Sequence, residues 1–155
     1  MYDFEFLNKY ISEIDDPHNQ NKKHVIYRLE DDVIEAEERL EKKFPNELRE
    51  FYLRLGYGFI CNLDKTHRDR VMDPHSVADF LLDEDDFIDP SIRELYPENM
   101  LVFFEVGEGT YLTLDLDQEE ENGICPVYYF EKKIAASLEE FLKKMDEEPD
   151  YYIHA

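Results

Sequence analysis

The stretch IEAEERLEKKFPNELREFYLRLGYGF, from Ile34 to Phe59, predicts two helices joined by a short hinge. Pro45 marks the start of the second helix, because a proline in the first turn loses no hydrogen bond and already has a helical φ. Beyond it, four large apolar residues recur at the i, i+3, i+4, i+7 spacing of one helix face. They are Leu48, Phe51, Tyr52 and Leu55. Gly56 then ends the helix in a left-handed conformation, and an extended segment follows.

The helix before the hinge is expected to begin at Asp32, because Asp32 and Glu35 have the spacing of a capping box. Its inward-facing residues are predicted to be Ile34, Ala36, Leu40 and Phe44. From the residues alone, the whole stretch is interpreted as two core helices of an ordinary domain.

The length of 155 residues favours a single domain, residues 1–155, that buries about two-thirds of its unfolded surface. We expect a core of about 32–145, preceded by an amphipathic N-terminal helix of about 3–15. An acidic tail, residues 146–155, follows the core. No apolar run approaches the roughly 18 residues that a membrane-spanning helix needs. The acidic N-terminus lacks the basic region of a secretory signal, so a cytoplasmic location is expected.

The charge balance is the strongest feature of the composition. The chain has 17 basic and 39 acidic residues, a net charge of −22. Such a surface repels nucleic-acid phosphates and anionic lipid, so neither nucleic acid nor a membrane is an expected partner. It attracts a basic protein and accelerates that encounter. The alternative is that the acidity only keeps the protein in solution.

The remaining segments indicate an α+β domain with a mostly antiparallel sheet. Residues 57–62 and 71–72 are predicted to be short strands, and residues 24–29 to be extended or a lead-in to the first long helix. Asp73-Pro74 opens a further helix, and residues 90–96 form a short one. Residues 101–106 and 110–116 predict a β-hairpin, followed by a third strand at 124–130. Ser137 and Glu140 form a capping box that starts the closing helix.

No catalytic or cofactor motif is present: the chain has no GxSxG, HExxH, P-loop or zinc spacing. We therefore expect no enzyme activity, no cofactor and no metal. The alternating acids from Asp115 to Glu121 suggest a calcium loop, but the glycine and glutamate that such a loop requires are missing, so a solvated turn is favoured. Cys61 and Cys125 are isolated and are expected to be reduced, a single disulfide between them being the alternative.

Four motifs in order resemble the SUKH superfamily, which groups yeast cell-wall-assembly regulators with bacterial immunity proteins. The first is the opening stretch, Ile34…Glu37…Leu40…Phe44-Pro45…Leu48…Phe51-Tyr52…Gly56. The second is Val71-Met72-Asp73-Pro74, and the third is Phe103-Phe104…Gly107-Glu108-Gly109-Thr110-Tyr111…Leu114-Asp115. The fourth joins Pro126-Val127-Tyr128 to the closing segment ASLEEFL, residues 136–142. Together the motifs cover most of residues 32–145.

The resemblance implies an α+β fold without catalytic residues, and a bacterial immunity protein that binds and neutralises a cognate toxin. The net charge of −22 fits such a role independently, since an acidic surface can occlude the basic groove of a nuclease. Two alternatives stay open. One is a regulatory or scaffolding domain without a toxin. The other is an acidic hydrolase or a calcium-dependent enzyme, which would need a pocket with convergent titratable groups.

Exposed acids and aromatics of the loops are the expected partner-binding residues. They are Tyr57, Glu108, Asp117, Glu119, Glu120 and Glu121. The alternative for the acids is a solvated turn without a partner. A local basic cluster, Lys65, His67, Arg68 and Arg70, is expected to pair with acids of the chain itself, or else to form a surface patch.

Overall fold

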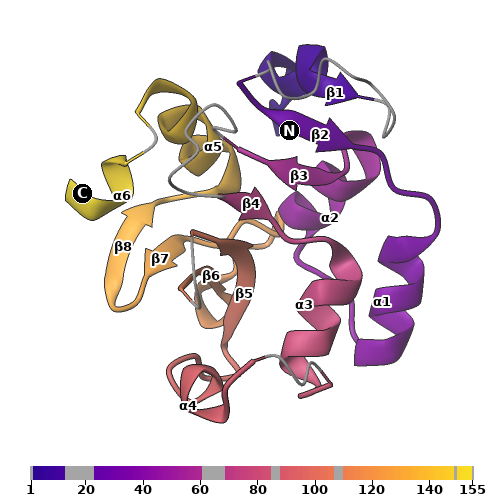
Figure 1. Cartoon of the computed structure of the whole chain (residues 1–155), viewed down its shortest axis with the longest axis vertical. Coiled ribbons are helices and arrows are strands. Elements are labelled where there is room, and N and C mark those ends of the chain that lie inside the picture. Colours follow the sequence, from indigo (N-terminus) through magenta and orange to yellow (C-terminus); the bar gives the residue numbers. More distant parts are fainter. Residues whose placement is uncertain are drawn as a thin grey trace.

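The opening stretch forms two helices in the computed structural model, which describes residues 2–12, 23–60, 69–84, 88–106, 110–148 and 150–154. Helix α1 spans Asp32–Leu40 and helix α2 spans Asn46–Arg54 (Figure 1). All four apolar residues predicted to line one face of α2 are buried, which confirms the helical spacing: Leu48, Phe51, Tyr52 and Leu55. Gly56 has a φ of 130°, and strand β3, Tyr57–Phe59, follows.

The inward face of α1 differs from the prediction. Ala36 and Phe44 are buried as predicted, and Leu40 is partly buried against the core. Ile34, however, is 52% exposed, and Val33 and Glu37 are buried instead. Glu37 can be buried because its carboxylate accepts a hydrogen bond from the Phe44 main-chain N–H at 2.9 Å and pairs with the Arg49 side chain. A charged residue therefore occupies a core position that hydrophobic periodicity assigned to a neighbour.

The helix starts also differ in detail from the prediction. Asp31, not Asp32, is the N-cap residue of α1, and its side chain makes no capping hydrogen bond. The Asp32 carboxylate accepts from the Glu30 N–H instead, at 3.0 Å. Pro45 is the N-cap of α2, one position before the first helical residue. Its extended conformation suits the turn between the helices.

The described residues form one eight-stranded sheet, whose strands are ordered β1 to β8 along the chain. Among these described strands, β1 and β2 pair in parallel and all other neighbours are antiparallel, which confirms the predicted fold class. Besides β3, the strands are β1 Ile11–Ser12, β2 Val25–Tyr27, β4 Arg70–Val71, β5 Met100–Glu105, β6 Tyr111–Asp115, β7 Val127–Tyr129 and β8 Lys132–Ala135. The predicted hairpin is β5 and β6. The predicted third strand is shorter than expected, and β8 was not anticipated.

The N-terminal segment is not the amphipathic helix predicted for residues 3–15. Residues Glu5–Tyr10 form a short 3-10 helix, η1, and β1 follows directly. The chain leaves the helix because Ile11 pairs with Ile26 of β2, a contact that local periodicity does not encode. Leu7 is nevertheless buried in the core. Residues 13–15 lie outside the described residues.

The other helices begin where capping residues indicated. Asp73 caps α3, Pro74–Leu81, by accepting from the Ser76 N–H. Ser137 caps α5, Leu138–Glu147, through the Glu140 N–H at 3.0 Å. The short helices are α4 Pro90–Arg93, α6 Tyr151–His154 and the 3-10 helix η3 Leu116–Gln118.

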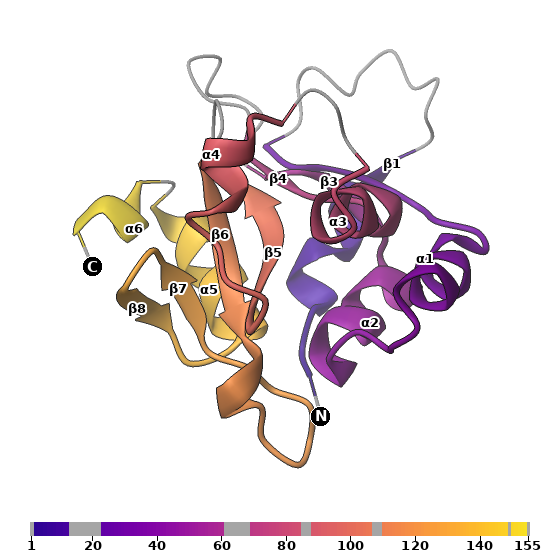
Figure 2. The ribbon, with the colours of Figure 1, turned by 90° about the horizontal axis from the view of Figure 1, so that it is seen from below.

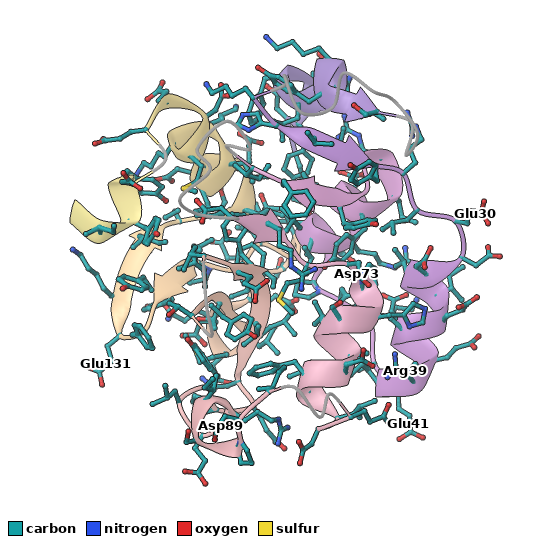
Figure 3. All side chains as sticks on the ribbon, viewed as in Figure 1. Glu30, Arg39, Glu41, Asp73, Asp89 and Glu131 are labelled. Carbon is teal, nitrogen blue, oxygen red and sulfur yellow. The ribbon has the colours of Figure 1, made fainter. Side chains whose placement is uncertain are left out.

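The β5–β6 hairpin separates two groups of elements. Figure 2 shows α1, α2 and α3 on one side of it, and β7, β8, α5 and α6 on the other. Arg39 joins α1 to α3, because its guanidinium donates to the Asp79 carboxylate at 2.6 Å and to His75 Nδ1 at 3.0 Å (Figure 3). Within the described residues, no helix combines the length and the apolar character needed to cross a membrane.

Candidate partner-binding site

The acidic segment after β6 is an ordered turn, because Asp115 holds it in place. The Asp115 carboxylate caps η3 by accepting from the Asp117 main-chain N–H at 3.0 Å. The same carboxylate also accepts from the side-chain amides of Gln118 and Asn99. Asp115 thus serves to shape the turn. The calcium loop considered from the sequence would need this carboxylate as a ligand, and no acid or histidine cluster suited to a metal ion occurs among the described residues.

The far end of this turn is fixed to α2 and to the N-terminal segment. Gly123, with a φ of 79°, accepts a hydrogen bond from the Glu47 main-chain N–H at 3.3 Å, and the Tyr2 hydroxyl donates to the Asn122 carbonyl. A Cβ atom at position 123 would come within 2.7 Å of the Asn46 nitrogen, so the close approach requires glycine. We call residues 117–121 the acidic turn.

The predicted partner-binding acids of the acidic turn lie together and are exposed. These are Asp117, Glu119, Glu120 and Glu121. Tyr57 is elsewhere, on β3, where it packs against Tyr27 with ring centroids 5.8 Å apart. Burial raises the pKa of its hydroxyl. In Figure 2 the acidic turn lies below β6 near the N-terminus, whereas β3 lies at the opposite end of the view. Glu108 falls outside the described residues.

Of the predicted basic cluster, only Arg70 is described. Its guanidinium donates to the Glu105 carboxylate at 2.8 Å on the neighbouring strand β5 and lies 3.6 Å from that of Asp73. This confirms an internal ion pair for Arg70. Lys65, His67 and Arg68 lie outside the described residues.

A groove beside the acidic turn was not anticipated from the sequence. It has a volume of about 620 Å³ and is formed by the segment after α4, by β6 and by the β7–β8 turn. Its walls are mainly apolar and aromatic. The lining residues are Leu95, Tyr96, Pro97, Asn99, Met100, Thr113, Asp115, Tyr128, Phe130 and Glu131. We call this the aromatic groove.

Phe130 is the most unusual residue of the aromatic groove. It has a φ of 55°, a region that bulky residues rarely adopt, and its side chain is 41% exposed. Its ring stacks on that of Tyr96, with centroids 5.8 Å apart and planes 20° from parallel. Tyr96 is fixed in turn, because its hydroxyl oxygen accepts from the Tyr111 N–H at 3.0 Å. The sequence signal was the aromatic run YYF, 128–130, ending at a turn.

The polar groups of the aromatic groove connect it to the acidic turn. Asp115 lines the groove and caps η3, and Gln118 donates both to Asp115 and to the Tyr128 hydroxyl. Thr113 is 2% exposed, and its hydroxyl oxygen has no hydrogen-bond partner within the part of the chain that the structure describes. Acids, aromatics and an unpaired hydroxyl therefore share one side of the β6–β7–β8 segment.

Cys125 and His24 lie outside the aromatic groove. Cys125 is buried beside Glu119, and its burial raises the pKa of the thiol to about 12, so the thiol stays protonated at neutral pH. Burial also lowers the pKa of His24, which contacts Asp146 at 2.7 Å near the end of α5. Cys61 lies outside the described residues. The aromatic groove and the acidic turn together are the candidate partner-binding surface.

Two comparisons identify the family. The SUKH family model described as SMI1-KNR4 cell-wall matches residues 30–142, which include both helices of the opening stretch and the aromatic groove. A protein of Bacillus subtilis (strain 168) named Immunity protein YxxD is 37% identical over 137 residues, which cover 86% of this chain and 90% of that protein. On this evidence the chain belongs to the SUKH family.

Proposed function

We propose that this chain is a bacterial immunity protein that binds a cognate toxin and neutralises it without catalysis. The observation that carries the proposal is the likeness to Immunity protein YxxD over 86% of the chain. Such a role requires a surface for another protein, and the acidic turn and the aromatic groove together have the composition of one.

The proposed toxin is basic, and a nuclease is the class that fits the charge best. A net charge of −22 attracts a cationic partner over distances of about a Debye length, roughly 8 Å at physiological salt. A nuclease carries a positive surface because it must hold the phosphate backbone. An immunity protein that covers this surface with carboxylates prevents the nucleic acid from binding. We place the encounter in the cytoplasm, where a nuclease would meet its substrate.

Co-expression tests the proposal. The toxin domain encoded beside this gene is expressed in cells with and without this protein, and growth and complex formation on a sizing column are measured. We expect restored growth and a co-eluting complex. Persistent toxicity without a complex would refute the proposal and favour a regulatory or scaffolding role.

A pair of matched variants tests the electrostatic part. The first replaces Glu119, Glu120 and Glu121 with glutamine. The second replaces the exposed Glu30, Glu38 and Glu41 with glutamine, which removes the same amount of charge from the α1 side of the molecule. Figure 3 shows Glu30 and Glu41 on that side. We expect only the first to reduce the association rate substantially, and more so at low salt. Equal reductions of the association rate by the two variants would show that the total net charge, and not one particular surface, accelerates the encounter.

A further inference from the structure

We infer that the aromatic groove receives an arginine side chain of the protein partner. The inference rests on the proposed function, since it names the contact through which the toxin would be held. It is carried by three features of the groove: a buried hydroxyl and carboxylates that lack, respectively, a hydrogen-bond partner and a cationic partner among the described residues, and an exposed aromatic ring.

The unpaired hydroxyl indicates a missing ligand. Thr113 is one of the lining residues and is 2% exposed, and its Oγ1 has no hydrogen-bond partner among the described residues. A buried polar atom without a hydrogen bond costs about 1–3 kcal/mol. A donor that enters the groove removes this cost. An apolar ligand would leave the hydroxyl unpaired, so the structure favours a polar occupant that offers the hydroxyl either a donor or an acceptor.

The carboxylates determine the charge of that occupant. Asp115 is 9% exposed and accepts from three neutral donors, which leaves one of the roughly four acceptor positions of a carboxylate free. Glu131 projects from the β7–β8 turn at the rim (Figure 3). No lysine, arginine or histidine lines the groove, and neither carboxylate pairs with a cation among the described residues. The occupant is therefore cationic.

The aromatic wall favours arginine over lysine. Phe130 and Tyr96 form a nearly parallel stack at the wall, and a planar guanidinium packs on such rings more readily than a strongly hydrated ammonium. The guanidinium also has five N–H donors, enough to reach a hydroxyl and a carboxylate together. The apolar lining, including Leu95 and Met100, suits the aliphatic part of the side chain.

Other occupants fit less well. A second copy of this chain would bring together two surfaces of proteins that each carry a charge of −22, so like-charge repulsion opposes it. An anionic small molecule would meet Asp115 and Glu131. The volume of about 620 Å³ lies in the range of about 300–1,000 Å³ found for ligand pockets, enough for an arginine with parts of its neighbours.

Variants of the groove test the inference in the complex with the toxin domain encoded beside the gene. Phe130→Ala removes the ring, and Thr113→Val replaces the hydroxyl with a methyl group of similar shape. Leu53→Ala is the matched control, because Leu53 is 51% exposed on α2 and lies outside the groove. By calorimetry, we expect Phe130→Ala to weaken the Kd about tenfold or more and Thr113→Val several-fold, with Leu53→Ala unchanged.

The denaturant concentration at the midpoint of unfolding distinguishes a variant that has lost a contact with the toxin from one that no longer folds. Thr113→Val is expected to unfold at the wild-type denaturant concentration or above it, because it removes an unpaired polar atom. The inference would be overturned if the wild-type protein binds the toxin and both groove variants bind it with the same affinity. That result would leave the proposed function standing. A wild-type protein that forms no complex would instead overturn the proposed function.

A peptide titration decides the inference without the toxin. The ¹⁵N-labelled protein is titrated with acetyl-Leu-Arg-Leu-amide and, separately, with its lysine counterpart. We expect chemical-shift changes concentrated at Thr113, Asp115 and Phe130, larger for the arginine peptide and lost in Phe130→Ala. Equal changes from both peptides, or changes confined to the acidic turn, would overturn the assignment of an arginine to the groove.

Discussion

Glu47 joins three separate parts of the fold, and its removal provides a quantitative test. Its carboxylate accepts from the Leu138 and Glu139 N–H groups at 2.8 and 3.1 Å, at the start of α5. Its own N–H donates to Gly123 at the end of the acidic turn. Glu47 is 2% exposed and has no cationic partner within the described residues. One residue of α2 therefore positions both α5 and the acidic turn.

We expect Glu47→Ala to lower the free energy of unfolding by about 2–3 kcal/mol. Hydrogen bonds to a charged acceptor contribute about 1.5–3 kcal/mol each, and relief of the desolvated charge offsets part of that loss. The assay is urea unfolding followed by circular dichroism at neutral pH. Glu38→Ala, an exposed position on α1, is the control and should stay within about 0.5 kcal/mol of wild type. A loss for Glu47→Ala below about 1 kcal/mol would refute the reasoning.

The ionisation of Glu47 leads to a second prediction, which concerns how the free energy of unfolding depends on pH. Burial raises the pKa of Glu47 above 4.5, although the two N–H groups of α5 act in the opposite direction. The folded state therefore binds this proton more tightly than the unfolded state. The contribution of Glu47 to stability is fully present below pH 4.5 and decreases as the pH rises through the raised pKa. The stability of wild type relative to Glu47→Gln should thus fall as the pH rises from 4.5 through the raised pKa, and a rise would contradict the assignment.

Three further predictions concern other parts of the fold. Tyr52→Phe should lower the free energy of unfolding by about 1–2 kcal/mol, because its buried hydroxyl donates to a main-chain carbonyl before α3 at 2.6 Å; an unchanged urea midpoint would contradict this. Gly123→Ala should destabilise the fold by more than about 1 kcal/mol and weaken toxin binding, because the left-handed conformation and the contact with α2 both disfavour a Cβ; wild-type melting would argue against that role. Burial lowers the pKa of His24 below 6.5, so its contribution is present above that pH and is lost as the pH falls through the lowered pKa. The stability of wild type relative to His24→Gln should accordingly decrease on acidification below pH 6.5, and a curve without that slope would exclude it.

Local patterns predicted those elements in which neighbours along the chain determine the structure. The apolar face of α2 and the caps Asp73 and Ser137 were found because spacing and capping chemistry act within one helix. On α1, Ala36 was assigned correctly, but Ile34 was wrongly placed inward and Glu37 was missed, because Glu37 is buried through a hydrogen bond from Phe44 beyond the helix end. The N-terminal helix was overextended for a similar reason, since β1 depends on pairing with a distant strand.

The candidate site was likewise predicted from the sequence only in part. Exposure of the acidic turn followed from its composition, but the turn's attachment to α2 through Gly123 did not. The aromatic groove was missed because its walls come from segments that are separate in the sequence, near Tyr96, Thr113 and Phe130. No periodicity marks such a site. The stack of Phe130 on Tyr96 depends on a left-handed backbone at a turn, which the residue type disfavours.

The residues that pack the core and the residues exposed on the surface lie in different segments of the fold, and this separation affects how related proteins could bind different partners. Helices α1 and α2 use their residues for packing, and Glu47 links them to α5 and to the acidic turn. The acidic turn, by contrast, carries exposed side chains such as Glu119, and the groove rim carries Phe130, which is 41% exposed. Substitutions there can change charge and shape at little cost in stability. Under the proposed function, partner specificity of this chain would reside in these surface segments, while the two-helix stretch maintains the scaffold that presents them.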